Sequence, residues 1–111
     1  MKSFTQVAYR KGPIMYIPKI MDTSNILLPK EIIRLQETLS ENTHENWAKH
    51  KIASGWVYGE LLDVKNKTHP DLIPYNLLSK EKKDYDRTTS METLKLLYYL
   101  GYRLVKEKRE L

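Results

Sequence analysis

The stretch Glu41–Gly59, with the sequence ENTHENWAKHKIASGWVYG, determines how this chain folds. It holds both tryptophans and two of the three histidines, and its second half turns at Gly55 into a short strand. Asn42, His44 and Trp47 fall within about a turn and a half at roughly 3.6 residues per turn. This spacing predicts a polar and aromatic cluster on one side of a helix. The cluster is either a platform for a ligand or an aromatic core with polar edges.

The composition is that of a folded globular domain. The chain has 111 residues, of which 41% are hydrophobic and 30% charged, enough for one domain with a modest core. No apolar run approaches the roughly 20 residues of a membrane span, and the first residues lack a signal-peptide layout. We therefore expect a cytoplasmic protein without membrane association. The absence of cysteine excludes disulfides and cysteine-ligated metals. The net charge of +5 comes from basic residues scattered among acids, so no nucleic-acid partner is expected.

The region 29–54 has the pattern of a long helix, with apolar residues recurring at helical spacing. Pro29 suits the first turn of this helix, and Gly55 suits its end because glycine tolerates a left-handed backbone. One long helix is the favoured interpretation. The alternative is a break near Asn42, where Asn42 and Glu45 could form a capping box.

A second helical region begins after Ser79, a suitable N-cap, and ends at Gly101. Thr89 and Glu92 form another capping-box candidate, so this region is either one helix or two. The apolar stripe of this region consists of Met91, Leu94, Leu97 and Tyr98.

The strands are expected to be short. Trp56–Tyr58 has the composition of a strand, and the sequence predicts that it pairs with Tyr102–Val105. Residues 60–78 show no sustained period and are expected to form a long packed loop. Pro13 and Pro18 bracket an extended segment. The predicted fold is α+β, with two long helical regions, short antiparallel strands and a long packed loop.

No catalytic or metal-binding pattern is present. His44 and His50 are six positions apart and lie on different helix faces, so they cannot chelate one metal together. His44 is expected to hydrogen-bond the backbone or a polar neighbour, and His69 with Pro70 to fix the loop. We find no nucleophile–base pairing and no phosphate-binding glycine loop, so neither enzymatic activity nor a cofactor is expected.

The aromatic and charged residues allow two interpretations. Trp47 and Trp56 can fill the core where helix meets sheet, or they can stack on a planar ligand. Asp86 and Arg87 can form an ion pair that fixes packing. Alternatively, Arg87 and Lys65 bind an anionic ligand, and Asp86 hydrogen-bonds to a polar edge of this ligand.

A series of short motifs runs in order from about residue 16 to 103. The motifs are Tyr16-x-Pro18, Asp22-Thr23-Ser24, Leu28-Pro29, Glu41-Asn42-x-His44-Glu45-x-Trp47-Ala48, Gly55-Trp56-x-Tyr58-Gly59, Lys67-x-His69-Pro70, Pro74-Tyr75, Tyr85-Asp86-Arg87, Met91-Glu92-Thr93-Leu94-Lys95 and Leu100-Gly101-Tyr102. In this order and spacing the chain resembles the RyR domain, the repeat found in the cytoplasmic part of ryanodine-receptor calcium channels and in small stand-alone bacterial proteins.

The resemblance implies an α+β fold of two long helices with short strands. It places the RyR domain at 13–106, after an extended or disordered lead-in (1–12) and before a charged tail (107–111). In the channels two such repeats pair about a pseudo-twofold axis, so a single-repeat protein is expected to form a homodimer. The family fold has no pore, so calcium-channel activity is not implied.

The resemblance also implies a ligand site, since the paired repeats of the channels look to bind adenine nucleotides. By position, Trp47 would stack on a base, with Trp56, Tyr58 and Asp86 near it. Many relatives carry an arginine where this chain has Leu62, so a cation for phosphate is missing there.

We therefore expect a non-enzymatic module that binds or senses a small, nucleotide-like ligand. The alternative is a protein-interaction or assembly module without a small-molecule ligand. The candidate ligand-binding residues are Asn42, His44, Trp47, Trp56, Tyr58, His69, Asp86 and Arg87.

Overall fold

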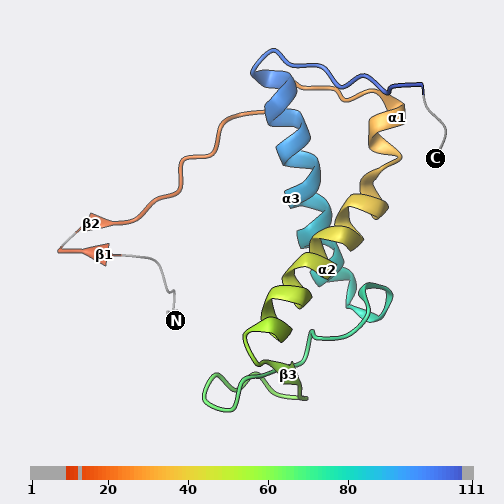
Figure 1. Cartoon of the computed structure of the whole chain (residues 1–111). Coiled ribbons are helices and arrows are strands. Elements are labelled where there is room, and N and C mark those ends of the chain that lie inside the picture. The colour runs from red at the N-terminus through yellow and green to blue at the C-terminus, as the bar shows by residue number, and fades with distance from the viewer. Residues whose placement is uncertain (1–9, 13, 109–111) are drawn as a thin grey trace.

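Two long helices that cross one another form the body of the molecule (Figure 1). The computed structural model describes residues 10–12 and 14–108. A short helix α1 (Lys30–Ile33) leads into α2 (Gln36–Ala53), and α3 (Lys80–Tyr99) crosses α2. The α+β class with two helical regions and short strands is therefore confirmed in its general form.

The first helical region is divided, and the division lies at Arg34–Leu35. The N–H of Leu35 donates to the carbonyl of Ile32 at 3.0 Å, a three-residue spacing that replaces the four-residue spacing of an α-helix. The expectation of one uninterrupted helix is therefore wrong. The alternative break near Asn42 is wrong as well, because α2 runs through that residue.

The ends of the long helices follow their local sequence signals. The side chain of Ser79 accepts a hydrogen bond from the N–H of Lys82 at 3.2 Å, which confirms it as the N-cap of α3. The helix then continues through Thr89 as a single element. Gly55 and Gly101 follow the two helices with φ angles of +91° and +101°. Only glycine adopts this region readily, so both predicted helix ends are confirmed.

The strand pairing near α2 differs from the prediction. Strand β3 (Val57–Tyr58) pairs in parallel with β4 (Thr68–His69), whereas Tyr102–Val105 forms no strand. The 20 residues of α3 span about 30 Å, and this length carries the chain to the end of the molecule opposite β3 (Figure 1). The predicted antiparallel pairing is therefore wrong. Gly59 follows β3, and a Cβ atom there would lie 2.5 Å from the Cβ of Thr68.

An N-terminal arm (residues 16–22) extends away from the helical body. It follows a small antiparallel hairpin of β1 (Arg10–Lys11) and β2 (Ile14–Met15), which stands apart from the helices (Figure 1). The radius of gyration is 17.9 Å, against about 13 Å for a compact chain of this length. The predicted lead-in and charged tail are described only in part, because 1–9 and 109–111 lie outside the described residues.

Few side chains are buried between the helices, so polar contacts are an important part of what holds them together. Thr43 of α2 and Ser90 of α3 lie 3.2 Å apart through their hydroxyl oxygens. Thr23 donates to Glu92 at 2.6 Å and so attaches the chain before α1 to α3. The buried side chains among the described residues are Thr23, Leu28, Ser40, His44, Tyr75, Leu78 and Tyr98.

Arg87 joins the two helices through charge. Its guanidinium donates to both carboxylate oxygens of Glu37 on α2, at 2.6 and 2.9 Å, and to Asp84 at 2.9 Å. Tyr75, in the 3-10 helix η1 (Tyr75–Leu77), donates to the same Glu37 at 3.1 Å. The Arg87 hydrogen bond is the main cause that holds the pKa of Glu37 below its ordinary range. Arg87 is thus a packing residue whose partners are Glu37 and Asp84.

We expect Glu37→Gln to lower the free energy of unfolding at neutral pH. In acid the variant and the wild-type chain should be equally stable. Because the folded-state pKa of Glu37 is lowered, its contribution is present above the ordinary carboxyl value near 4.5 and is lost as the pH falls through the folded-state value. Urea unfolding of both chains at pH 7, 5 and 3 would measure the difference in their stability at each pH. Glu41→Gln, at an exposed position on the same helix, is the control. A deficit of equal size at all three pH values would contradict the ion-pair explanation.

Candidate functional site

The α2 side of the site is formed by His44 and Trp47, which lie three positions apart and share one helix face. Their rings stack with centroids 5.5 Å apart and planes inclined by 25°. His44 is only 4% exposed, and its Nε2 atom lies 2.7 Å from the carbonyl oxygen of Ile73. A carbonyl only accepts hydrogen bonds, so Nε2 carries a proton and donates. The expected hydrogen bond from His44 to the backbone is confirmed.

The loop contributes His69, whose ring packs against Trp47. The two centroids are 4.8 Å apart and the planes are nearly perpendicular, at 77°. The Nδ1 atom of His69 accepts from the N–H of Asp71 at 3.0 Å, which fixes the turn at Pro70 as predicted. Burial lowers the pKa of His69 and prevails over the neighbouring Asp71 carboxylate, which acts in the opposite direction. His69 therefore presents a neutral ring at neutral pH.

The α3 side of the site carries Lys82 and Asp86, four residues apart on one helix face. Lys82 forms an ion pair with Asp71 of the loop and so connects the loop to α3. Burial raises the pKa of Asp86, and the nearby His44 opposes this shift. Within residues 10–12 and 14–108, no donor is hydrogen-bonded to the Asp86 carboxylate.

These walls enclose a pocket of about 340 Å³, called the aromatic pocket below. Three segments contribute to it: α2, the loop between β3 and α3, and the first half of α3. The residues that line it are Thr43, His44, Trp47, His69, Asp71, Leu78, Lys82, Tyr85 and Asp86.

The structure brings together half of the predicted ligand-binding residues. Trp56 lies outside the pocket lining but close to it, with its ring centroid 6.2 Å from that of His69. Tyr58 and Asn42 are exposed, and Arg87 is engaged between the helices. The predicted residues that line the aromatic pocket are His44, Trp47, His69 and Asp86.

Sequence reasoning missed the residues that complete the walls. Lys82 lies one helical turn before Asp86, and Tyr85 is its chain neighbour, so reading the helix face around Asp86 would have found both. Asp71 lies two residues after His69 and could have been found from the turn. The other missed residues are Thr43 and Leu78.

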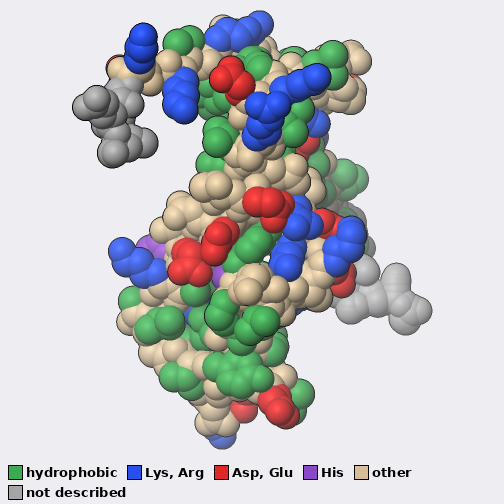
Figure 2. Space-filling view, turned by 90° about the vertical axis from the view of Figure 1, so that its right-hand side faces the viewer, with side chains coloured by type: hydrophobic (Ala, Val, Ile, Leu, Met, Phe, Trp, Pro, Cys, Tyr) green, Lys and Arg blue, Asp and Glu red, His purple; other side chains and the backbone are tan. Residues whose placement is uncertain are grey.

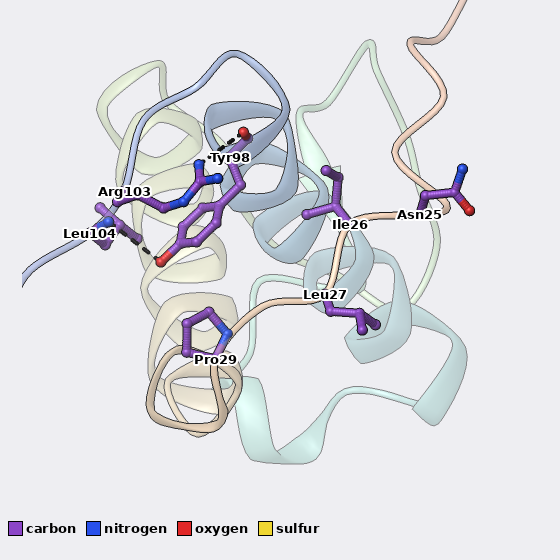
Figure 3. Close-up of a pocket in the computed structure, with 7 residues that line it drawn as sticks. All are labelled: Asn25, Ile26, Leu27, Pro29, Tyr98, Arg103 and Leu104. Carbon is purple, nitrogen blue, oxygen red and sulfur yellow. Dashed lines mark hydrogen bonds between the residues drawn. The ribbon is translucent and has the colours of Figure 1, made fainter.

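A second hollow, of about 480 Å³, lies where the C-terminal segment passes over α3 (Figure 3). The Arg103 guanidinium stands 5.0 Å from the centre of the Tyr98 ring and donates to the carbonyls of Tyr98 and Tyr102. The Tyr98 hydroxyl accepts from the N–H of Leu104 at 3.4 Å. These polar groups hold the segment against the helix, and none of the predicted residues lines this hollow. The aromatic pocket gathers four of the predicted residues and is therefore the candidate site.

The described part of the chain shows no group of three or more His, Cys, Asp or Glu side chains that could hold a metal ion. No helix within residues 10–12 and 14–108 has the length and apolar character needed to span a bilayer. Acidic and basic side chains are intermixed over the middle of the face in Figure 2.

Fold and pocket together define a small α+β domain in which two crossed helices and their connecting loop enclose an aromatic pocket. Residues 16–106 match the family described as the RyR domain, and this chain belongs to that family. The resemblance predicted from the ordered motifs is thus confirmed over most of the chain.

We expect His44→Ala to destabilise the fold by about 1–3 kcal/mol, because it leaves the Ile73 carbonyl without its donor. His50→Ala is the matched control. His50 is exposed on the same helix, so its loss should change stability by no more than about 0.5 kcal/mol. Chemical unfolding of both variants measures the difference. Equal stabilities would show that the His44 hydrogen bond does not hold the loop.

Proposed function

We propose that this protein is a non-enzymatic module that binds or senses a small planar ligand of nucleotide type in the aromatic pocket. The observation that supports this most is Asp86, a partly buried carboxylate without a hydrogen-bond donor in the described part of the chain, in the same pocket as the Trp47 and His69 rings. The pocket volume of about 340 Å³ is within the range of small-molecule sites. Aromatic faces with a few directed polar groups are typical of such sites.

The base and the phosphate of a nucleotide each have a suitable counterpart. A base that stacks on aromatic rings gains on the order of 1–3 kcal/mol. Asp86 would orient the polar edge of that base. Lys82 lines the pocket and is half exposed, and its ammonium group is paired with Asp71. By exchanging Asp71 for a phosphate, it would supply the positive charge of the arginine missing at Leu62.

A single-tryptophan variant gives a direct binding test. The Trp56→Phe variant leaves Trp47 as the only tryptophan, so a nucleotide that stacks in the pocket should quench its fluorescence. Calorimetric titration of the wild-type chain with purine and pyrimidine nucleotides should give the same affinities as the fluorescence titration of the variant.

Trp47→Leu should weaken that binding at least tenfold, with the loss of stacking as the reason. Unfolding measurements on this variant would check that it is folded. The proposal would be overturned by the absence of both heat and quenching across the nucleotide panel.

An assembly role is the second candidate, and the N-terminal arm favours it. Ile17 is 73% exposed and Ile20 is 85% exposed, and the neighbouring Tyr16 and Met21 are exposed as well. Contiguous exposed apolar surface is typical of protein-interaction sites. The proposed partner is a second copy of this chain.

We expect light scattering to give the mass of a dimer for the wild-type chain, and the mass of a monomer for the double variant Ile17→Ser, Ile20→Ser. Serine removes apolar area from the arm without touching the helical body or the aromatic pocket. Ile52→Ser, at an exposed position at the far end of α2, is the control and should stay dimeric. A wild-type monomer at high concentration would remove the assembly proposal.

A further inference from the structure

We propose that the aromatic pocket selects purines whose pairing edge carries two adjacent N–H donors, as in guanine, over adenine. This preference differs from the adenine nucleotides that the resemblance to the channel repeats implies. Asp86 is the residue that determines this specificity. The inference rests on the proposed function, since it requires that the pocket bind nucleotides at all.

Two polar side chains of the aromatic pocket are already engaged within the protein. His44 is engaged through Nε2 with the carbonyl of Ile73, and the ammonium group of Lys82 is paired with Asp71. Asp86 differs from both, because both its oxygens lack a donor within the described part of the chain. A ligand that enters the pocket would therefore meet a carboxylate with its full accepting capacity.

The carboxylate of Asp86 favours a ligand edge that offers two donors. An ionised carboxylate has two acceptor oxygens and no donor. Burial raises the pKa of Asp86 above its ordinary value, and the neighbouring His44 acts in the opposite direction. Burial also increases the cost of leaving the group unpaired, so a ligand with matching donors gains more than it would in water.

The purines differ in the donors that their pairing edges present. Guanine presents N1–H and the N2 amino group side by side, so the two carboxylate oxygens can each accept one hydrogen bond. Adenine presents its N6 amino group beside the N1 lone pair, so the second carboxylate oxygen would face another acceptor. Hypoxanthine has the N1–H but lacks the N2 amino group, and it should rank between the two.

An amide at position 86 would present a different hydrogen-bonding pattern to the ligand. An asparagine side chain is nearly the same size as that of aspartate but combines one donor group with one acceptor, and that pattern matches adenine. Asp86→Asn should therefore reverse the order of preference. A role of Asp86 in structure alone would weaken the binding of all purines equally.

Calorimetric titration with GMP, IMP and AMP tests this, because the three carry the same sugar and phosphate and differ only in the base. For the wild-type chain we expect GMP to bind about tenfold or more tightly than AMP, since a hydrogen bond to a charged group contributes at least that factor, with IMP between them. For Asp86→Asn we expect AMP to bind more tightly than GMP. Thermal unfolding followed by circular dichroism verifies that the variant is folded. If the variant is unfolded, the order of the wild-type affinities for GMP, IMP and AMP tests the proposed preference.

The outcomes separate the inference from the proposed function. Wild-type affinity for AMP equal to or greater than that for GMP would overturn the selectivity and leave nucleotide binding standing. An unchanged preference for GMP in a folded Asp86→Asn variant would overturn the role of Asp86. The absence of binding by all three nucleotides would overturn the proposed function itself.

Discussion

The hydrogen bond from the His44 ring to the Ile73 carbonyl is the contact on which the arrangement of the site depends. It attaches the loop to α2 and fixes the plane of the imidazole, which in turn stacks on Trp47. Once the loop is attached there, the His69 ring packs edge-on against the same tryptophan. The pocket therefore forms only when the loop is attached to α2. Its aromatic wall consists of side chains from this helix and from a loop with little regular structure.

The crossing of α2 and α3 is maintained by directional polar contacts as well as by apolar packing. The bidentate contact of Arg87 with Glu37 fixes the relative position of the helices, and Tyr75 adds the loop to the same carboxylate. Since few apolar side chains are buried, such contacts define which of several similar helix crossings is adopted. Arg87 is accordingly engaged in structure, while the adjacent Asp86 remains available to the pocket.

The sequence predicts features that depend on local chemistry and misses those that depend on distant residues. Ser79 and Gly101 mark the limits of α3 correctly, because capping and left-handed backbone are properties of a few neighbouring residues. The partner of β3 was predicted wrongly, because the position of Tyr102–Val105 depends on the direction and length of the 20-residue helix α3 that precedes it. His44, Trp47, His69 and Asp86 were identified from motifs, and the helix face around Asp86 also points to Lys82. The ion pair of Lys82 with Asp71 depends on how the loop packs against α3, which no local pattern reveals.

Three of the long-range hydrogen bonds of this chain are nested in sequence, which bears on the order of folding. His44 and Ile73 are 29 residues apart, Glu37 and Arg87 are 50 apart, and Thr23 and Glu92 are 69 apart, each pair enclosing the one before. The entropy lost on closing a loop grows with its length, and an inner closure shortens the chain that remains to be closed. The favoured route therefore closes the contacts from the inside outward, so the walls of the pocket are among the first tertiary structure to form and the attachment at Thr23 is among the last.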